Sequence, residues 1–159
     1  MNAHLPAMPP EGRHRYVVRV YYEDTDAGGV VYHANYLRLA ERARTEALRE
    51  LGIPHAELVQ RFNLMFMVRR IEVDYLRSAR VDDSLVVETE VLAVGGASVS
   101  LRQSVRGSAG DCAVLAVRLA CVRLGEGGHR PGRLPPRWRE LLQAMRDARP
   151  GVGMLGAGM

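Results

Sequence analysis

One long amphipathic helix is predicted between residues 33 and 51, and it limits the folds open to this chain more than any other feature. Apolar or small side chains recur there with the spacing of a helix that buries one face: Tyr36, Ala40, Ala43, Ala47 and Leu51. Gly52 provides the stop, and Pro54 prevents the helix from continuing. Because a lone helix must bury its apolar face on another element, the rest of the chain has to supply a surface for it.

That surface is predicted to be a β-sheet. Five segments have the alternation or the apolar composition of strands: residues 16–22, 65–76, 85–91, 97–105 and 112–124. In the segment 65–76, the alternation places Met67, Ile71, Val73 and Tyr75 on the apolar face, with Arg69 as an exception. A period of two in the segments 65–76, 85–91 and 97–105 therefore contrasts with the helical period before them.

The connections between these strands predict hairpins. Gly95-Gly96 and the segment Gly107-Ser-Ala-Gly-Asp are tight-turn signals between the third, fourth and fifth strands. A short helical or loop segment is expected at residues 53–63. The sequence thus predicts an α+β fold in which an antiparallel five-stranded sheet wraps around one long central helix.

The ends of the chain differ in composition from this core. Residues 1–14 are proline-rich and aperiodic, so we expect a disordered N-terminal arm before a domain that covers residues 15–124. Residues 125–159 form an arginine-rich C-terminal extension, in which Pro135-Pro136 opens a short amphipathic helix and residues 151–159 form a flexible tail. This division predicts one domain with two appendages.

The totals exclude several classes of protein. A chain of 159 residues with 47% hydrophobic content can bury one substantial core. No apolar run approaches the ~20 residues of a membrane span, and the N-terminus lacks the order of a secretory signal. Cys112 and Cys121 fall nine residues apart in one apolar segment, so strand alternation places them on opposite faces as reduced thiols. We therefore expect a cytoplasmic protein.

The basic charge is concentrated at one end. Net charge is +4, and every basic residue is arginine. Residues 125–159 hold six arginines against three acidic residues, which leaves the rest of the chain nearly neutral. A basic tail can contact RNA, anionic lipid or an acidic carrier protein, but a solvated tail is the simpler interpretation. No nucleic-acid partner is expected.

Chemistry is concentrated between residues 20 and 36. Asp24 and Asp26 follow the first strand, two glycines come next, and the long helix starts near His33. A calcium loop fails because oxygen ligands do not continue at the required positions, and the phosphate-binding glycine patterns are absent. Two interpretations remain: an ordinary turn in which Asp24 caps locally, or a catalytic carboxylate facing a helix N-terminus.

His33 also has more than one interpretation. Its imidazole can act as an acid or base, or simply pack, whereas its backbone N–H can donate to an oxyanion whatever the side chain. The other histidines form no cluster with ligand spacing, so no metal site is expected. No serine or cysteine lies in a nucleophile elbow, which disfavours a serine hydrolase.

The segment Tyr22-Glu-Asp-Thr-Asp-Ala-Gly-Gly-Val-Val-Tyr-His-Ala-Asn-Tyr36, with Glu41-Arg-Ala-Arg-Thr-Glu46, closely resembles the signature of the 4-hydroxybenzoyl-CoA thioesterase family. The resemblance is greatest to its Tol-Pal-associated, YbgC-like acyl-CoA thioesterases. It implies a hotdog fold, an acyl-CoA substrate, no cofactor and a homotetramer. It also implies that Asp26 is the essential carboxylate, as nucleophile or general base, and that the backbone N–H at His33 is the oxyanion donor.

Alternatives to hydrolysis stay open at this point. A hotdog hydratase acting on acyl-CoA or acyl carrier protein is one, and a non-catalytic acyl-CoA-binding module is another. Acyl carrier protein remains open as a partner. Tyr32, Arg70 and Arg77 are candidates for substrate binding, the two arginines because guanidinium groups suit the phosphates of CoA. Either arginine can equally be an ordinary surface residue. The segment Met65-Phe-Met67 is either part of an acyl pocket or plain core.

Overall fold

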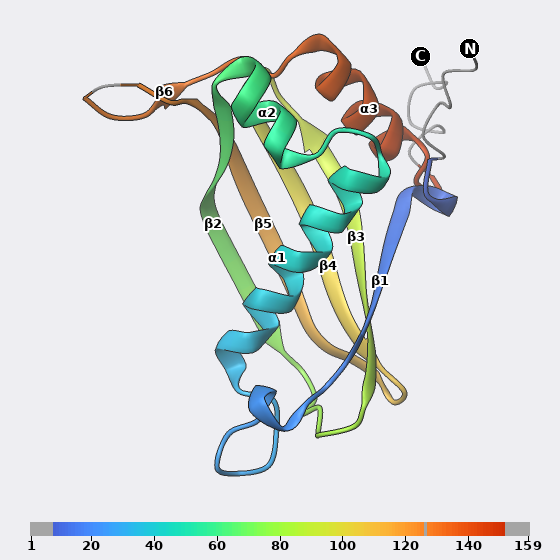
Figure 1. Ribbon diagram of the computed structural model, residues 1–159. Coiled ribbons are helices and arrows are strands. Elements are labelled where there is room, and N and C mark those ends of the chain that lie inside the picture. The colour runs from blue at the N-terminus through green and yellow to red at the C-terminus, as the bar shows by residue number, and fades with distance from the viewer. Residues whose placement is uncertain (1–7, 126, 152–159) are drawn as a thin grey trace.

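A curled antiparallel sheet partly surrounds one long helix in the computed structural model, which describes residues 8–125 and 127–151 (Figure 1). Five long strands pair in the order β1 (Arg13–Arg19), β3 (Ser84–Val94), β4 (Ser98–Gly107), β5 (Gly110–Arg123) and β2 (Leu64–Tyr75). A two-residue strand, β6 (Arg130–Pro131), also pairs with β5. The predicted α+β architecture is confirmed, including the hairpins around residues 95–96 and 107–110.

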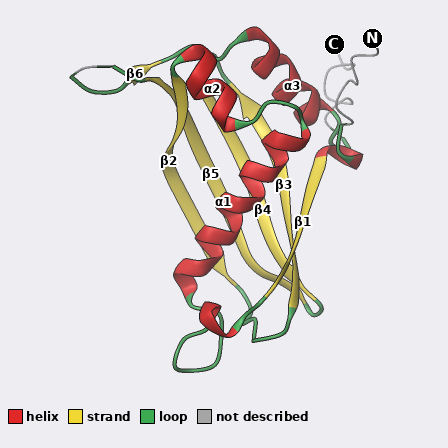
Figure 2. Ribbon diagram, viewed as in Figure 1, coloured by secondary structure: helices red, strands yellow, loops and turns green. Residues whose placement is uncertain are grey.

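The long helix α1 (His33–Glu50) lies across the concave face of the sheet, where Figure 2 shows it between the viewer and the strands. Its predicted apolar stripe is buried, and Gly52 has a φ of 79°, a left-handed conformation that suits glycine after a helix end. Two shorter helices, α2 (His55–Phe62) and α3 (Pro136–Asp147), cover the end of the sheet beside the C-terminus of α1. None of the helices among the described residues is long and apolar enough to cross a membrane.

Residues 10–14 are ordered structure, so the expectation of a disordered arm through residue 14 was wrong for this part. A short 3-10 helix, η1 (Pro10–Gly12), leads directly into β1 at Arg13. Gly12 packs so tightly on the end of α3 that a β-carbon there would lie 2.4 Å from the backbone oxygen of Met145. This close contact holds η1 against the end of α3. The rest of the expected arm, and the expected tail beyond residue 151, lie outside the described residues.

The helix α3 is part of the main core. Trp138, Leu142 and Met145 are buried in the same hydrophobic cluster as the central strands. The Trp138 ring lies 6.2 Å from the Phe66 ring of β2, measured between ring centroids. The packing of the described part of the C-terminal extension therefore continues that of the domain before it.

A β-bulge in β2 corrects the predicted face of one residue. Met67 pairs with Ala120 of β5, whereas Ile71 pairs with Val117, because the register shifts between residues 68 and 70. Four steps along β2 thus match three along β5, which places Met67 and Ile71 on opposite faces. Arg69, the exception in the alternation, lies at this bulge.

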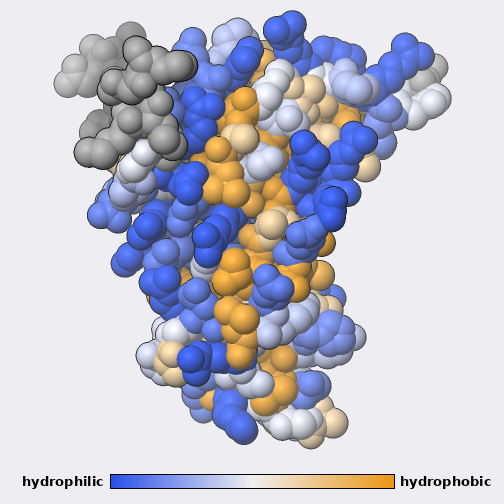
Figure 3. Space-filling view, turned by 180° about the vertical axis from the view of Figure 1, so that it is seen from behind, coloured by the Kyte–Doolittle hydropathy of each residue, from blue (hydrophilic) through white to orange (hydrophobic). Residues whose placement is uncertain are grey.

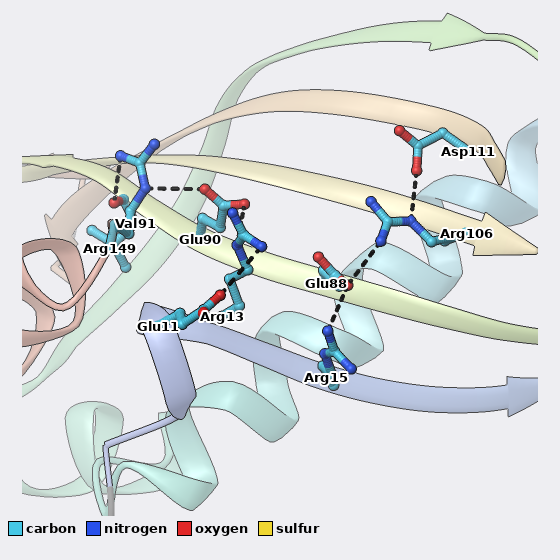
Figure 4. Close-up of polar contacts among 9 residues, drawn as sticks. All are labelled: Glu11, Arg13, Arg15, Glu88, Glu90, Val91, Arg106, Asp111 and Arg149. Carbon is cyan, nitrogen blue, oxygen red and sulfur yellow. Dashed lines mark hydrogen bonds and ion pairs between the residues drawn. The ribbon is translucent and has the colours of Figure 1, made fainter. Parts of the chain in front are cut away.

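The face of the sheet opposite α1 carries a band of hydrophobic residues flanked by hydrophilic ones (Figure 3). Figure 4 shows two groups of ion pairs, centred on Glu88 and Glu90 of β3. Glu88 of β3 is only 5% exposed and lies 3.4 Å from both Arg15 and Arg106. Glu90 lies 3.3 Å from Arg13 and 3.0 Å from Arg149, which follows α3. These groups tie the first strand and the end of α3 to β3.

Candidate active site

The loop before α1 is shaped by hydrogen bonds that converge on Asp24. The Asp24 carbonyl accepts from the Tyr32 N–H (2.9 Å) and from the Asn35 side-chain amide (2.8 Å). Its carboxylate accepts from the Tyr21 N–H (2.8 Å), across the short 3-10 helix η2 (Tyr22–Asp24). Local capping, one of the two interpretations left open for this segment, is thus the role of Asp24.

Asp26 lies at the tip of the same loop with a different set of contacts. Its backbone N–H donates to Val30 O (2.9 Å), and its Oδ1 accepts from the Gly28 N–H (2.8 Å). Gly29 closes the turn with a φ of 76°, where glycine avoids the steric cost of a side chain. No hydrogen bond within the described part of the chain uses Asp26 Oδ2, and the side chain is exposed. One carboxylate oxygen is therefore held while the other is open to a ligand.

The loop after β2 supports the loop that carries Asp26. The Val31 N–H donates to Ala79 O (2.8 Å), and Val30 forms an isolated β-bridge with Arg80. The Ala79 N–H in turn donates to the hydroxyl of Tyr36 on α1 (3.3 Å). Burial raises the pKa of the Tyr36 phenol, so the hydroxyl stays protonated at neutral pH. The loop that carries Asp26 is thereby fixed to the start of the helix.

The first turn of α1 borders a surface hollow that Asp26 also lines. Tyr32 is the N-cap and has no side-chain capping bond, and no hydrogen bond among residues 8–125 and 127–151 uses the N–H of His33 or Ala34. These free donors carry the positive end of the helix dipole. The hollow has a volume of about 270 Å³ and is lined by Glu23, Thr25, Asp26, Tyr32, Ala34, Asn35 and Arg38.

The structure brings some of the predicted site residues together. Asp26 and Tyr32 line one hollow beside the N-terminus of α1. The imidazole of His33 is exposed, with its ring centroid 4.5 Å from that of Tyr32 and 6.2 Å from that of Tyr75. The Tyr75 hydroxyl donates to the His33 carbonyl (3.1 Å), which holds the end of β2 against the helix.

The two candidate arginines lie elsewhere. Arg70 pairs with Arg118 in the sheet, on the face of β2 opposite Tyr75, and forms an ion pair with Glu72. Arg77 lies just after β2, where its backbone N–H donates to Cys112 O (3.2 Å). Neither lines the hollow of Asp26. Arg77 is on the loop nearer to the start of α1, whereas Arg70 is on the far side of the sheet.

Some residues of the site escaped the sequence analysis, namely Asn35, Tyr36 and Tyr75. Tyr36 and Tyr75 shape the site through partners more than 40 residues away, so spacing gave no signal for them, whereas Asn35 bonds Asp24 within the segment 20–36. Burial raises the pKa of both cysteine thiols, which keeps them protonated and unsuited as nucleophiles. The described residues contain no group of three or more His, Cys, Asp or Glu side chains arranged to hold a metal ion.

Comparison with known proteins gives a consistent result. Residues 28–114 match the thioesterase superfamily. The acyl-CoA thioesterase YbgC of Haemophilus influenzae is 49% identical over 69% of this chain and 80% of its own length. The acyl-CoA thioester hydrolase YbgC of Escherichia coli O157:H7 is 47% identical over 57% of this chain and 67% of its own.

Solved structures agree with the sequence relatives. The probable thioesterase from Bartonella henselae superposes with a TM-score of 0.71 at 35% identity, over 77% of this chain and 99% of that one. The Staphylococcus aureus protein SAV2348, solved in complex with CoA, has a TM-score of 0.80 at 13% identity, over 89% of this chain and 88% of that one, which shows the shared hotdog fold. The chain belongs to the thioesterase superfamily.

Proposed function

We propose that this protein hydrolyses the thioester of an acyl-CoA to a free acid and CoA. The names of its YbgC relatives support this substrate class. The observation that carries the proposal is the pairing of an exposed carboxylate, Asp26, with the uncapped N-terminus of α1 around one hollow. Acyl transfer from a thioester needs these two elements, a nucleophile or base and a donor for the oxyanion.

The carboxylate can act in one of two ways. Asp26 Oδ2 attacks the carbonyl carbon to form a mixed anhydride, thiolate leaves, and water then hydrolyses the anhydride. Alternatively, Asp26 removes a proton from a water that attacks the same carbon. In both routes the Gly28 N–H fixes the orientation of the carboxylate through Oδ1. Because thiolate is a good leaving group, neither route needs a strong general acid.

The helix N-terminus supplies the second element. The carbonyl oxygen of the thioester becomes an oxyanion in either route, and the His33 N–H is the donor proposed to receive it. Loss of one such donor costs about 3–4 kcal/mol in other enzymes. In this arrangement the backbone of His33 is needed and its imidazole is not.

The resemblance also suggests assembly, and the sheet edge supports it. The strand β2 pairs only with β5 among the described residues, which leaves its other edge free. That edge exposes Val68 (48%) and Tyr75 (49%), two large apolar side chains. We infer a homodimer through this edge and, by resemblance, a tetramer made of two such dimers. Light scattering at micromolar concentration tests this, and an active monomer would contradict it.

Location and partners are inferred from the same family. We place the protein in the cytoplasm and associate it with the Tol-Pal system by resemblance alone. Acyl carrier protein is a second thioester carrier that the arginine-rich C-terminal segment can contact. A pull-down with acyl carrier protein at low and at physiological salt tests that contact, because a charge-driven complex weakens as salt rises.

Thiol release across a panel of acyl-CoA substrates tests the central proposal. We expect release of free CoA in proportion to free acid, with a preference for certain acyl groups. Crotonyl-CoA serves as the discriminating substrate, because loss of its enoyl absorbance without thiol release would identify a hydratase instead. Binding of acyl-CoA without any turnover would leave a binding module and exclude the enzyme.

A further inference from the structure

Arg44, about two turns before the end of α1, has a buried guanidinium that forms no ion pair with a carboxylate of the described residues. Arg44 is only 8% exposed. None of the ion pairs within the described part of the chain includes it. Buried arginines in folded proteins are normally paired, because removing an unpaired charge from water is costly. Arg44 therefore lacks the partner that its environment calls for.

The one hydrogen bond of this side chain is to a neutral group. Arg44 Nη1 donates to Gln103 Oε1 (2.9 Å) on β4. Gln103 is fully buried, and its Nε2 donates to Ala40 O and to Thr89 Oγ1, both at 2.9 Å. These two bonds fix the amide, so its oxygen must face Arg44. Gln103 thus holds the guanidinium from one side and leaves its charge unneutralised.

The other N–H groups of Arg44 border an open space. In the described residues, the fully buried side-chain nitrogens and oxygens without a hydrogen-bond partner do not include any nitrogen of Arg44. The nitrogens of Arg44 that form no hydrogen bond are therefore accessible from the cavity. Arg44 lines a cavity of about 480 Å³ between α1, the sheet and α3, a volume typical of small-molecule sites. Most of its wall is apolar, with contributions from Phe66, Val68, Ile71, Leu101, Leu119 and Leu142.

None of the other described ionisable groups around the cavity forms an ion pair with Arg44. His55 of α2 has its pKa lowered by burial and by the charge of Arg44, so it is neutral at pH 7. Glu41 and Arg38 are exposed and also line the cavity; the charge of Glu41 raises the pKa of Arg44, but the two side chains form no ion pair. Burial lowers the pKa of Arg44 more than the charge of Glu41 raises it, although a guanidinium remains protonated in proteins.

We propose that this cavity binds an apolar chain that ends in a carboxylate, and that Arg44 is the counter-ion of that carboxylate. The guanidinium fork matches carboxylate geometry, and the apolar wall matches the chain. The cavity and the hollow of Asp26 share Arg38, so the two spaces are neighbours along α1. Arg44 follows His33 by eleven residues, or about 16 Å of helical rise, which leaves room for an extended chain between them.

Two molecules have this chemistry, and the second depends on the proposed function. One is a free fatty acid bound with its carboxylate at Arg44. The other is an acyl-CoA whose acyl group carries a second carboxylate at its far end. The binding of a carboxylate-ended chain itself holds whether or not the protein hydrolyses acyl-CoA.

Titration with decanoate and decanol tests the binding. Fluorescence of Trp138, the single tryptophan of the chain, reports on the cavity because its ring contacts Phe66. We expect wild-type protein to bind decanoate about ten- to a hundredfold more tightly than decanol. Arg44→Met should abolish that preference and retain decanol binding, whereas Arg49→Met, an exposed arginine of the same helix, should match wild type. Equal preference in Arg44→Met and wild type would overturn the proposal.

A wild-type measurement keeps the test decisive if Arg44→Met does not fold. An apolar cavity alone raises the pKa of a bound carboxyl group, whereas a guanidinium partner lowers it. The carboxyl resonance of bound [1-13C]decanoate should therefore titrate below that of the free acid. A bound resonance that titrates above the free acid, or no decanoate binding, refutes the role of Arg44.

Kinetics then identify the source of the carboxylate. If Arg44 binds the far end of a substrate, kcat/KM should favour an acyl-CoA with a terminal carboxylate over decanoyl-CoA, and Arg44→Met should reverse that order. If it binds a free acid, decanoate should inhibit wild type and not Arg44→Met, with no preference between substrates. A wild type that binds decanoate through Arg44 but hydrolyses no acyl-CoA would refute the proposed function and leave this site intact.

Discussion

The two ends of α1 hold their charged groups in opposite ways. At the N-terminus, Asp26 is exposed and is positioned by backbone hydrogen bonds within a short loop. Toward the C-terminus, Arg44 is buried and donates to Gln103 of β4, which in turn donates to Thr89 of β3. Little apolar area is buried around Asp26, so a change there should affect the chemistry and not the stability of the fold. Around Arg44 the two are coupled, because any ligand of that cavity also contacts the hydrophobic core.

This contrast predicts that Asp26→Asn removes activity and spares stability. The asparagine Oδ1 can still accept from the Gly28 N–H, so the turn remains. Loss of the carboxylate should lower kcat by about 10²- to 10⁴-fold while the melting temperature stays within experimental error. Asp24→Asn is the control, because that residue caps the loop, and its effect on kcat should be much smaller. Wild-type activity in Asp26→Asn would remove Asp26 from the mechanism.

In contrast, Trp138→Ala in α3 should lower stability and spare activity. Truncation of this fully buried side chain leaves a cavity in the core that α3 shares with the sheet. We expect a loss of about 3–5 kcal/mol in the free energy of unfolding, measured by urea denaturation. The folded fraction should keep its kcat with a short acyl-CoA. A loss below about 1 kcal/mol would show that α3 is dispensable to the core.

The N-terminus of α1 offers a sharper test of the backbone donor. His33 is the first helical residue, where proline is well tolerated, and Tyr32 before it already has an extended conformation. His33→Pro should remove the proposed oxyanion donor and lower kcat by about 10²- to 10³-fold without unfolding the helix. His33→Ala keeps the N–H and should lose far less activity. Equal losses in the two variants would assign the role to the imidazole.

The smallest effect is expected for the arginines outside the hollow. Arg77→Ala should raise KM for acyl-CoA several-fold with little change in kcat, because a phosphate contact is shared by ground and transition states. An acyl-pantetheine, which lacks the nucleotide, should show no such change. Arg70→Ala is the matched control, since Arg70 lies on the opposite face and pairs with Glu72. A larger effect at Arg70 would place the nucleotide across the outer face of the sheet.

The elements of this fold could be predicted because their signals are local. The stripe of α1 and the alternation of the strands depend on neighbours a few residues away, and the helix and all five long strands were found. The sequence indicated the position of the bulge in β2 but not its effect on the neighbouring side chains. Arg69 breaks the alternation in the sequence, but the side to which Met67 turns depends on the register with β5.

The supporting parts of the site could not be predicted for the same physical reason. The Tyr36 hydroxyl meets Ala79 across 43 residues, and the Tyr75 hydroxyl meets His33 across 42. Arg44 lies within the apolar side of the helix, between Leu48 and Leu51 by helical spacing, so its burial leaves a local signal, whereas its partner Gln103, 59 residues away, does not. Such long-range partners leave no trace in local spacing, whereas the carboxylate and the helix start are adjacent in sequence.

The ion-pair groups on the outer face also bear on how copies of this chain can associate. Arg13 and Arg15 of β1, one edge of the sheet, pair with Glu90 and Glu88, so these charges are already matched within one copy. The opposite edge, β2, exposes Val68 and Tyr75 beside four charged side chains, Arg69, Arg70, Glu72 and Asp74. If two copies pair their β2 edges about a two-fold axis, as proposed above, each copy uses that edge once, so this contact closes at a pair and further assembly has to use another surface.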